Sequence, residues 1–173
     1  VEISKEYNLI VDIDEFYKYM FLQKKNNDIE NKFYFLSDNF VFKDSNFIGY
    51  NFINFFSKIE HIIVDGKMIN FLNSFCKCIL ILNNTTFYPE SGGQVGDRGF
   101  ILGQNFIFFV ENVKIINNFY IHLGYLKFGY IKLGSYVKSC VDYLFRKNIS
   151  LNHSATHILN YVLKNNLSKN IKQ

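Results

Sequence analysis

A stretch dense in glycine constrains the fold of this chain more than any other. Residues 85–99 spell Thr-Thr-Phe-Tyr-Pro-Glu-Ser-Gly-Gly-Gln-Val-Gly-Asp-Arg-Gly and hold four of the ten glycines and the single proline. Glycine tolerates positive φ and lets a second backbone or a ligand come close, so the stretch is predicted to be an irregular loop. Hydroxyl, amide and carboxylate groups stand between the glycines and are suited to recognition.

Short apolar runs on both sides of this loop predict β-strands. The Asp65-Gly66 pair between residues 62–64 and 67–69 is typical of a hairpin with a type I′ turn. Another turn is expected at residues 102–105. Many short strands with closely spaced turns indicate a small β-barrel. The expected strands are 33–36, 47–56, 76–82, 100–102, 106–111 and 113–122.

Helical spacing of apolar residues marks the two ends of the chain. Residues 11–25 predict an amphipathic helix that begins near Asp12 or Asp14. Beyond Asp142 a short helix and then a second one, ending near residues 165–166, are expected. The fold class is therefore α+β: an N-terminal helix, a small β-barrel and the helical start of a second α+β unit. The expected divisions are 1–30, 31–140 and 141–173.

Composition excludes several classes of protein. No run approaches the roughly 20 apolar residues of a membrane span and no signal leader opens the chain, so a cytoplasmic location without a membrane partner is expected. Three cysteines argue against a disulfide framework. We attribute the 20 Phe and 12 Tyr to biased codon usage rather than to a surface on which bases stack. A first residue of valine suggests part of a longer protein.

Two histidines four residues apart are the second informative feature. His153 and His157 would project from one face of a helix, as two ligands of one zinc ion do. Two ordinary surface or core histidines are the alternative. Residues 154–156 lack the glutamate that a zincin needs as general base, which excludes that class of metalloprotease.

Zinc requires more ligands than this pair. Cys76 and Cys78 do not have the usual CxxC spacing and are better explained as small buried residues. Cys140 is a weak further candidate. His61 and His122 each stand alone in a strand context and are interpreted as structural.

Two motifs together resemble one family. Residues 85–99 look like the TxFYxESGGQxGDxG signature of alanyl-tRNA synthetases, and residues 152–159 look like their NHSATHLL motif. The resemblance implies a parent enzyme that joins alanine to tRNA(Ala) with ATP and Mg²⁺ in a catalytic domain absent from this chain. The part present would be the β-barrel and the start of the editing domain, which hydrolyses mischarged Ser-tRNA(Ala) and Gly-tRNA(Ala).

The resemblance also implies roles for individual residues. His153 and His157 would bind zinc, with a Cys and a His beyond residue 173 completing the site. Thr85 would contact the hydroxyl of a misattached serine, and Gln94 would position the aminoacyl end of the tRNA acceptor. A pocket for alanine cannot strongly refuse serine or glycine, so a second sieve is needed. Asn83 and Phe145 depart from the family, which often has Asp and Arg there.

Other functions fit part of the pattern. A freestanding trans-editing aminoacyl-tRNA deacylase shares the barrel and the histidines, but such proteins typically carry three glycines in the loop. Threonyl-tRNA synthetases share the histidine pair but not the glycine loop. A degenerate, non-catalytic tRNA-binding module is the alternative outside enzymes.

Overall fold

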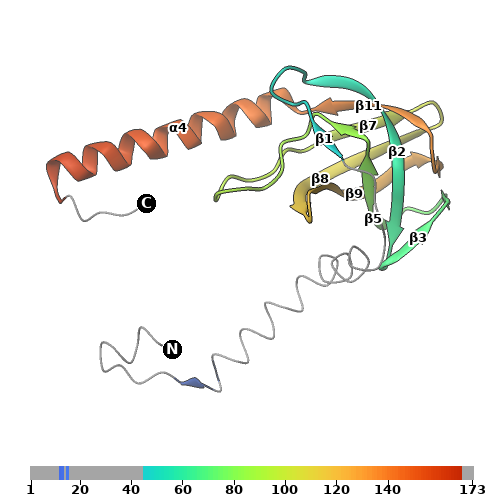
Figure 1. Cartoon of the computed structure of the whole chain (residues 1–173), viewed down its shortest axis with the longest axis horizontal. Helices are drawn as coiled ribbons and strands as arrows, with labels where there is room; N and C mark the ends of the chain where they lie inside the picture. The colour runs from blue at the N-terminus through green and yellow to red at the C-terminus, as the bar shows by residue number, and fades with distance from the viewer. Residues whose placement is uncertain (1–11, 14, 16–44, 169–173) are drawn as a thin grey trace. The chain divides into compact units, whose positions relative to one another are not determined.

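A computed structural model describes residues 12, 13, 15 and 45–168 of the chain. Six antiparallel strands form a closed barrel in the order β2-β5-β9-β8-β7-β11 (Figure 1). Closure occurs because β11 pairs with β7 on one side and with β2 on the other. The barrel strands are β2 (Asn54–Val64), β5 (Lys77–Leu82), β7 (Gly99–Gly103), β8 (Phe106–Ile116), β9 (Phe119–Gly129) and β11 (Tyr136–Val141). The predicted small barrel is confirmed.

Short strands extend this barrel. β3 (Lys67–Ile69) continues the sheet beside β2, and β1 (Asn46–Phe47) runs parallel to β6 (Asn84–Thr85). β4 (Phe71–Leu72) pairs with β10 (Ile131–Lys132). All of these elements belong to one compact unit, Val41–Gln173. In the described residues, no helix has both the length and the apolar character needed to cross a membrane.

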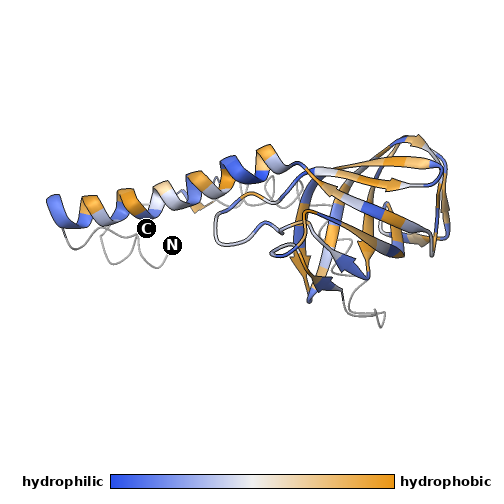
Figure 2. Ribbon diagram, turned by 90° about the horizontal axis from the view of Figure 1, so that it is seen from above, coloured by the Kyte–Doolittle hydropathy of each residue, from blue (hydrophilic) through white to orange (hydrophobic). Residues whose placement is uncertain are grey.

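The core fills the inside of the barrel. Ile59, Leu80, Phe108, Val110 and Leu126 come from four different strands, and each is completely buried. Alternate residues of an antiparallel strand point to one face, so each long strand sends every second side chain inward. Apolar residues accordingly dominate the strands in Figure 2. Burial of these side chains is what holds the barrel closed.

The predicted hairpin at Asp65-Gly66 is confirmed. Val64 pairs with Lys67, and φ is +49° at Asp65 and +74° at Gly66, as a type I′ turn requires. The turn after Gly103 also lies where it was expected. The predicted strand 47–56 is instead two strands, because a turn separates the end of β1 from Asn54.

The predicted division into strands 106–111 and 113–122 is wrong. β8 continues to Ile116, and the chain turns at Asn117 and Asn118, whose φ values are +48° and +67°. The inward-pointing residues change phase between Val110 and Val113, both of which are fully buried. A β-bulge between Val110 and Asn112 absorbs that change within one strand.

The two short helices expected after Asp142 are one helix. α4 (Tyr143–Asn166) runs without interruption and ends where expected. No glycine or proline occurs within it, so nothing in its sequence stops the helix. Asp142 caps its start by accepting a hydrogen bond from the Phe145 N–H at 3.0 Å.

Two expectations fall mainly outside the described residues. The predicted strand 33–36 lies wholly outside them. Of the predicted helix 11–25, only residues 12, 13 and 15 are described, and there the Glu15 N–H donates to Asp12 Oδ1 at 2.9 Å. That bond is of the kind that begins a helix.

Candidate functional site between the glycine loop and helix α4

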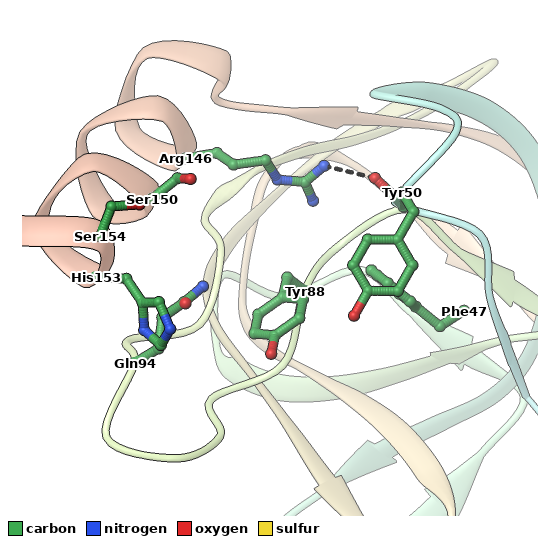
Figure 3. A pocket seen from close by; sticks show the side chains of 9 residues that line it. Phe47, Tyr50, Tyr88, Gln94, Arg146, Ser150, His153 and Ser154 are labelled. Carbon is green, nitrogen blue, oxygen red and sulfur yellow. Dashed lines mark hydrogen bonds between the residues drawn. The ribbon is translucent and has the colours of Figure 1, made fainter. Parts of the chain in front are cut away.

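Two cavities lie between the glycine-rich loop and α4. The aromatic cavity, of about 290 Å³, is lined by Phe47, Gly49, Tyr50, Tyr88, Gln94, Arg146, Ser150, His153 and Ser154 (Figure 3). The loop cavity, of about 360 Å³, is lined by Gly92, Gly93, Gln94, Val95, Ile149, Asn152, His153 and Thr156. Gln94 and His153 line both. The structure thus brings together one residue from each of the two sequence motifs.

A tight turn at the tip of the loop positions Gln94. The N–H of Ser91 donates to the Gln94 carbonyl at 3.2 Å, and the N–H of Gln94 donates to the Ser91 carbonyl at 2.9 Å. Gly92 and Gly93 between them have φ of +58° and +81°. Glycine adopts such angles without the steric cost that other residues incur. The predicted irregular loop is therefore confirmed, and its turn faces α4.

The base of the loop is tied to α4 by a partly buried ion pair. Asp97 is only 2% exposed, and its Oδ2 accepts hydrogen bonds from the Tyr88 N–H at 2.6 Å and from Arg146 Nε at 2.9 Å. Arg146 Nη2 also donates to Asp97 and to the Thr86 carbonyl. Its Nη1 donates to the Gly49 carbonyl at 3.0 Å. One guanidinium thus joins the helix, the loop and the turn after β1.

Thr85, the first residue of the glycine-rich motif, does not line either cavity. Its side chain is fully buried. Thr85 Oγ1 lies 2.7 Å from His122 Nε2 and accepts a hydrogen bond from the Phe87 N–H at 3.1 Å. His122 Nδ1 lies 2.9 Å from the Leu80 carbonyl, which can only accept, so the proton is on Nδ1 and Nε2 accepts from Thr85. Burial lowers the pKa of His122 to about 4 and keeps the ring neutral, against the opposing effect of the Leu80 bond.

The two motif histidines face each other on α4. Their Nε2 atoms lie 3.0 Å apart. Two nitrogen ligands of a tetrahedral zinc at 2.0–2.1 Å would be separated by about 3.3 Å, so the pair fits two corners of such a site. In residues 12, 13, 15 and 45–168, no group of three or more His, Cys, Asp and Glu residues could hold a metal ion. His153 and His157 are therefore the donors that the described chain offers.

No cysteine of the described residues joins the two histidines in a group that could hold a metal ion. Cys78 is buried in the core, and burial together with the nearby Cys76 raises the pKa of its thiol to about 12. Cys140 is half-buried on β11, and burial raises its pKa as well.

The two departures from the family pattern have local structural partners. Asn83 Oδ1 accepts hydrogen bonds from the Lys58 N–H at 2.8 Å and from the Asn84 N–H at 2.9 Å. An aspartate oxygen would accept the same bonds. The ring of Phe145 lies 4.0 Å from the Arg98 guanidinium in a cation–π contact.

Sequence reasoning missed three parts of this site. The partnership of Asp97 with Arg146 spans 49 residues, and that of Thr85 with His122 spans 37. Neither leaves a local pattern. The aromatic side of the first cavity was missed because Phe47, Tyr50 and Tyr88 lie on separate segments. The available signals were that Tyr88 falls inside the glycine-loop motif and that residues 47–50 also match the family pattern.

Comparisons with known proteins agree with this arrangement of motifs. The family of tRNA synthetases class II (A) matches residues 1–144. The chain belongs to that family. It is 36% identical to the alanine–tRNA ligase of Buchnera aphidicola subsp. Baizongia pistaciae, over 100% of this chain and 20% of that protein. It is 31% identical to the alanine–tRNA ligase of Crocosphaera subtropica, over 99% of this chain and 20% of that protein.

These matches confirm the resemblance to alanyl-tRNA synthetases. The chain spans about one fifth of the length of the curated relatives that it matches. The family match ends at residue 144, near the start of α4 and before the histidine motif, whereas the two alanine–tRNA ligases match through that motif.

Proposed function

We propose that this segment serves an alanine–tRNA ligase as part of its editing site, hydrolysing the ester of tRNA(Ala) mischarged with serine or glycine. The observation that carries the proposal is that Gln94 and His153 line the same two cavities. Membership of a tRNA synthetase family supports tRNA as the partner. The acceptor end of that tRNA would bind in the two cavities. The complete ligase reaction, with ATP and Mg²⁺, belongs on this proposal to a region outside the segment.

On this proposal each residue of the site has a separate role. The side-chain amide of Gln94, at the tip of the loop, can hydrogen-bond the aminoacyl end and hold it beside α4. His153 and His157 would hold zinc, which when bound can polarise a carbonyl or activate water. The loop and the helix keep their spacing because Arg146 joins them. Completion of the metal site by a Cys and a His beyond residue 173 is part of the proposal.

A contact between Thr85 and the serine hydroxyl remains a prediction from the resemblance. In the structure the Thr85 hydroxyl already donates to His122 and accepts from Phe87, and the side chain is fully buried. A direct substrate contact would require the backbone above it to move. The role that its geometry supports is fixing the start of the glycine loop.

Hydrolysis of Ser-tRNA(Ala) and Gly-tRNA(Ala) tests the proposal. The segment is placed within a full-length alanine–tRNA ligase, and release of serine and glycine is followed with and without Gln94→Ala or His153→Ala. We expect both variants to lose deacylation while still forming Ala-tRNA(Ala). Ser91→Ala, on the same turn as Gln94 but lining neither cavity, is the control for loop disturbance. Unchanged deacylation in both site variants would refute the proposal.

A further inference from the structure

Three aromatic rings form one side of the aromatic cavity. Phe47 contacts Tyr50 edge to face at a centroid separation of 5.0 Å and Tyr88 at 5.8 Å, and Tyr50 lies 6.5 Å from Tyr88. Tyr120 stacks on Phe47 at 5.8 Å. Figure 3 shows the rings of Tyr50 and Tyr88 side by side, facing the end of the cavity that holds His153 and Gln94. We call Phe47, Tyr50 and Tyr88 the aromatic wall.

Exposure separates Tyr50 from the barrel core, whereas Phe47 and Tyr88 are half-buried. Phe108 in the core is fully buried, whereas Tyr50 is 83% exposed. An exposed ring gains little from hydrophobic burial, so core packing does not account for its position. Codon bias can explain how many aromatic residues the chain contains, but it does not explain why three of them gather at one cavity.

The position of the wall is held by backbone hydrogen bonds. The Ile48 N–H donates to the Thr85 carbonyl at 2.9 Å, and Arg146 Nη1 donates to the Gly49 carbonyl at 3.0 Å. These bonds fix the turn that carries Tyr50 before any ligand arrives. A preformed surface avoids the entropic cost of ordering loops on binding.

The rest of the cavity is polar. Gln94, Ser150, His153 and Ser154 face the wall from the loop and from α4. The pKa of Tyr120 is raised, first by burial and then by Tyr50 and Tyr88, so the tyrosine side chains converge here as well. A flat aromatic surface opposite hydrogen-bonding groups suits a nucleoside, whose base has two apolar faces and a polar edge.

We propose that the aromatic wall binds the terminal nucleoside of a tRNA acceptor end by stacking of its base against Tyr50 and Tyr88. This inference rests on the proposed function, because it places the ester-bearing ribose next to Gln94 and His153. To the proposed function it adds the residues that bind the base of the last nucleoside. Because the aromatic wall contacts the base, its contribution to RNA affinity does not require an aminoacyl group on the RNA.

Fluorescence of a modified RNA tests the stacking directly. The 173-residue chain is titrated with an RNA hairpin ending in CCA whose terminal adenosine is replaced by 2-aminopurine riboside, a base whose fluorescence is quenched when it stacks. Hairpins ending in CCA and in CC are compared for affinity. We expect quenching, and about fivefold or tighter binding of the hairpin that carries the terminal nucleoside.

Variants at Tyr50 assign the effect to the wall. Tyr50→Leu should remove the quenching and make the two hairpins bind equally, while Tyr50→Phe should keep both effects because the ring remains. Tyr136→Leu is the matched control, since Tyr136 is 77% exposed and lies at the start of β11, away from α4. Circular dichroism verifies that each variant is folded.

The outcomes separate this inference from the proposed function. Equal binding of the two hairpins by the unaltered chain, no binding at all, or an unchanged preference in Tyr50→Leu would overturn the inference, and hydrolysis of mischarged tRNA is measured independently. Quenching that depends on Tyr50, in a ligase that does not clear Ser-tRNA(Ala), would support the wall and refute the editing role.

Discussion

Arg146 and Asp97 join helix α4 to the glycine loop through the nearly buried Oδ2 of the aspartate, which accepts from Arg146 Nε at 2.9 Å. The side chain of Asp97 is 3% exposed and that of Arg146 is 20% exposed. Asp97 has a second donor in the Tyr88 N–H, so its charge is compensated by a cation and by a backbone dipole. This connection joins the two elements between which both cavities lie.

Removing Arg146 is expected to destabilise the unit strongly. Arg146→Ala leaves a buried carboxylate without its cation, a change that typically costs about 3–5 kcal/mol. Urea denaturation of the 173-residue chain measures it. The control is Arg98→Ala, whose ion pair with Asp142 is largely accessible to solvent and whose loss should cost about 1 kcal/mol or less. Equal losses in the two variants would mean that the Asp97 pair has no special role.

Replacing Thr85 should destabilise the loop although valine keeps the shape of threonine. Thr85→Val leaves His122 Nε2 and the Phe87 N–H without a buried partner, at a cost of about 1–3 kcal/mol in the free energy of unfolding. Thr86→Val is a matched control. Among the described residues the neighbouring Thr86 hydroxyl is buried without a hydrogen-bond partner, so its loss should be neutral or stabilising. The reverse order would contradict the assigned hydrogen bonds.

The same Thr85→Val substitution in a full-length ligase tests the role implied by the family. If Thr85 contacts the serine hydroxyl, clearance of Ser-tRNA(Ala) should fall more than clearance of Gly-tRNA(Ala), because glycine offers no hydroxyl. Equal losses on the two substrates would show that Thr85 acts by holding the loop.

Acid should weaken the fold through His122. Its pKa in the folded protein, about 4, lies below the ordinary value of 6.5, so the unfolded chain binds a proton that the folded chain excludes. The stabilisation is complete above about pH 6.5 and is lost as the pH falls toward 4, by up to about 3 kcal/mol.

Proton NMR measures this directly. The His122 ring signals should remain those of the neutral form at pH 5.5 in the folded chain, whereas in urea they should titrate near pH 6.5. Titration of His122 near 6.5 in the folded chain would contradict the buried Leu80–His122–Thr85 arrangement.

Zinc affinity should depend on residues beyond His153 and His157. A structural zinc site takes four protein ligands and a catalytic one takes three, whereas the described chain offers a pair. We expect the 173-residue chain to lose zinc to a chelator and the segment within a full-length ligase to retain it. His157→Asn should reduce retention in the longer protein. Stoichiometric, chelator-resistant zinc in the 173-residue chain would refute the need for further ligands.

Local chemistry made several elements predictable. Asp65-Gly66 specifies its turn because these residues tolerate positive φ, and the density of glycine in residues 85–99 excludes a regular element. The spacing of His153 and His157 places both rings on one helical face whatever the helix packs against. The same local reasoning failed at residue 112, because a bulge shifts the phase of side chains without ending the strand.

The sequence by itself therefore determined the turns, the glycine loop, the histidine pair and the family resemblance, all of which depend on neighbours within a few residues. Only the tertiary structure decided that Thr85 is buried against His122, that Arg146 holds Asp97, and that Tyr50 and Tyr88 face Gln94 and His153 across one cavity. Those relationships join residues many positions apart, and barrel closure sets them because it fixes which strands and loops become neighbours in space.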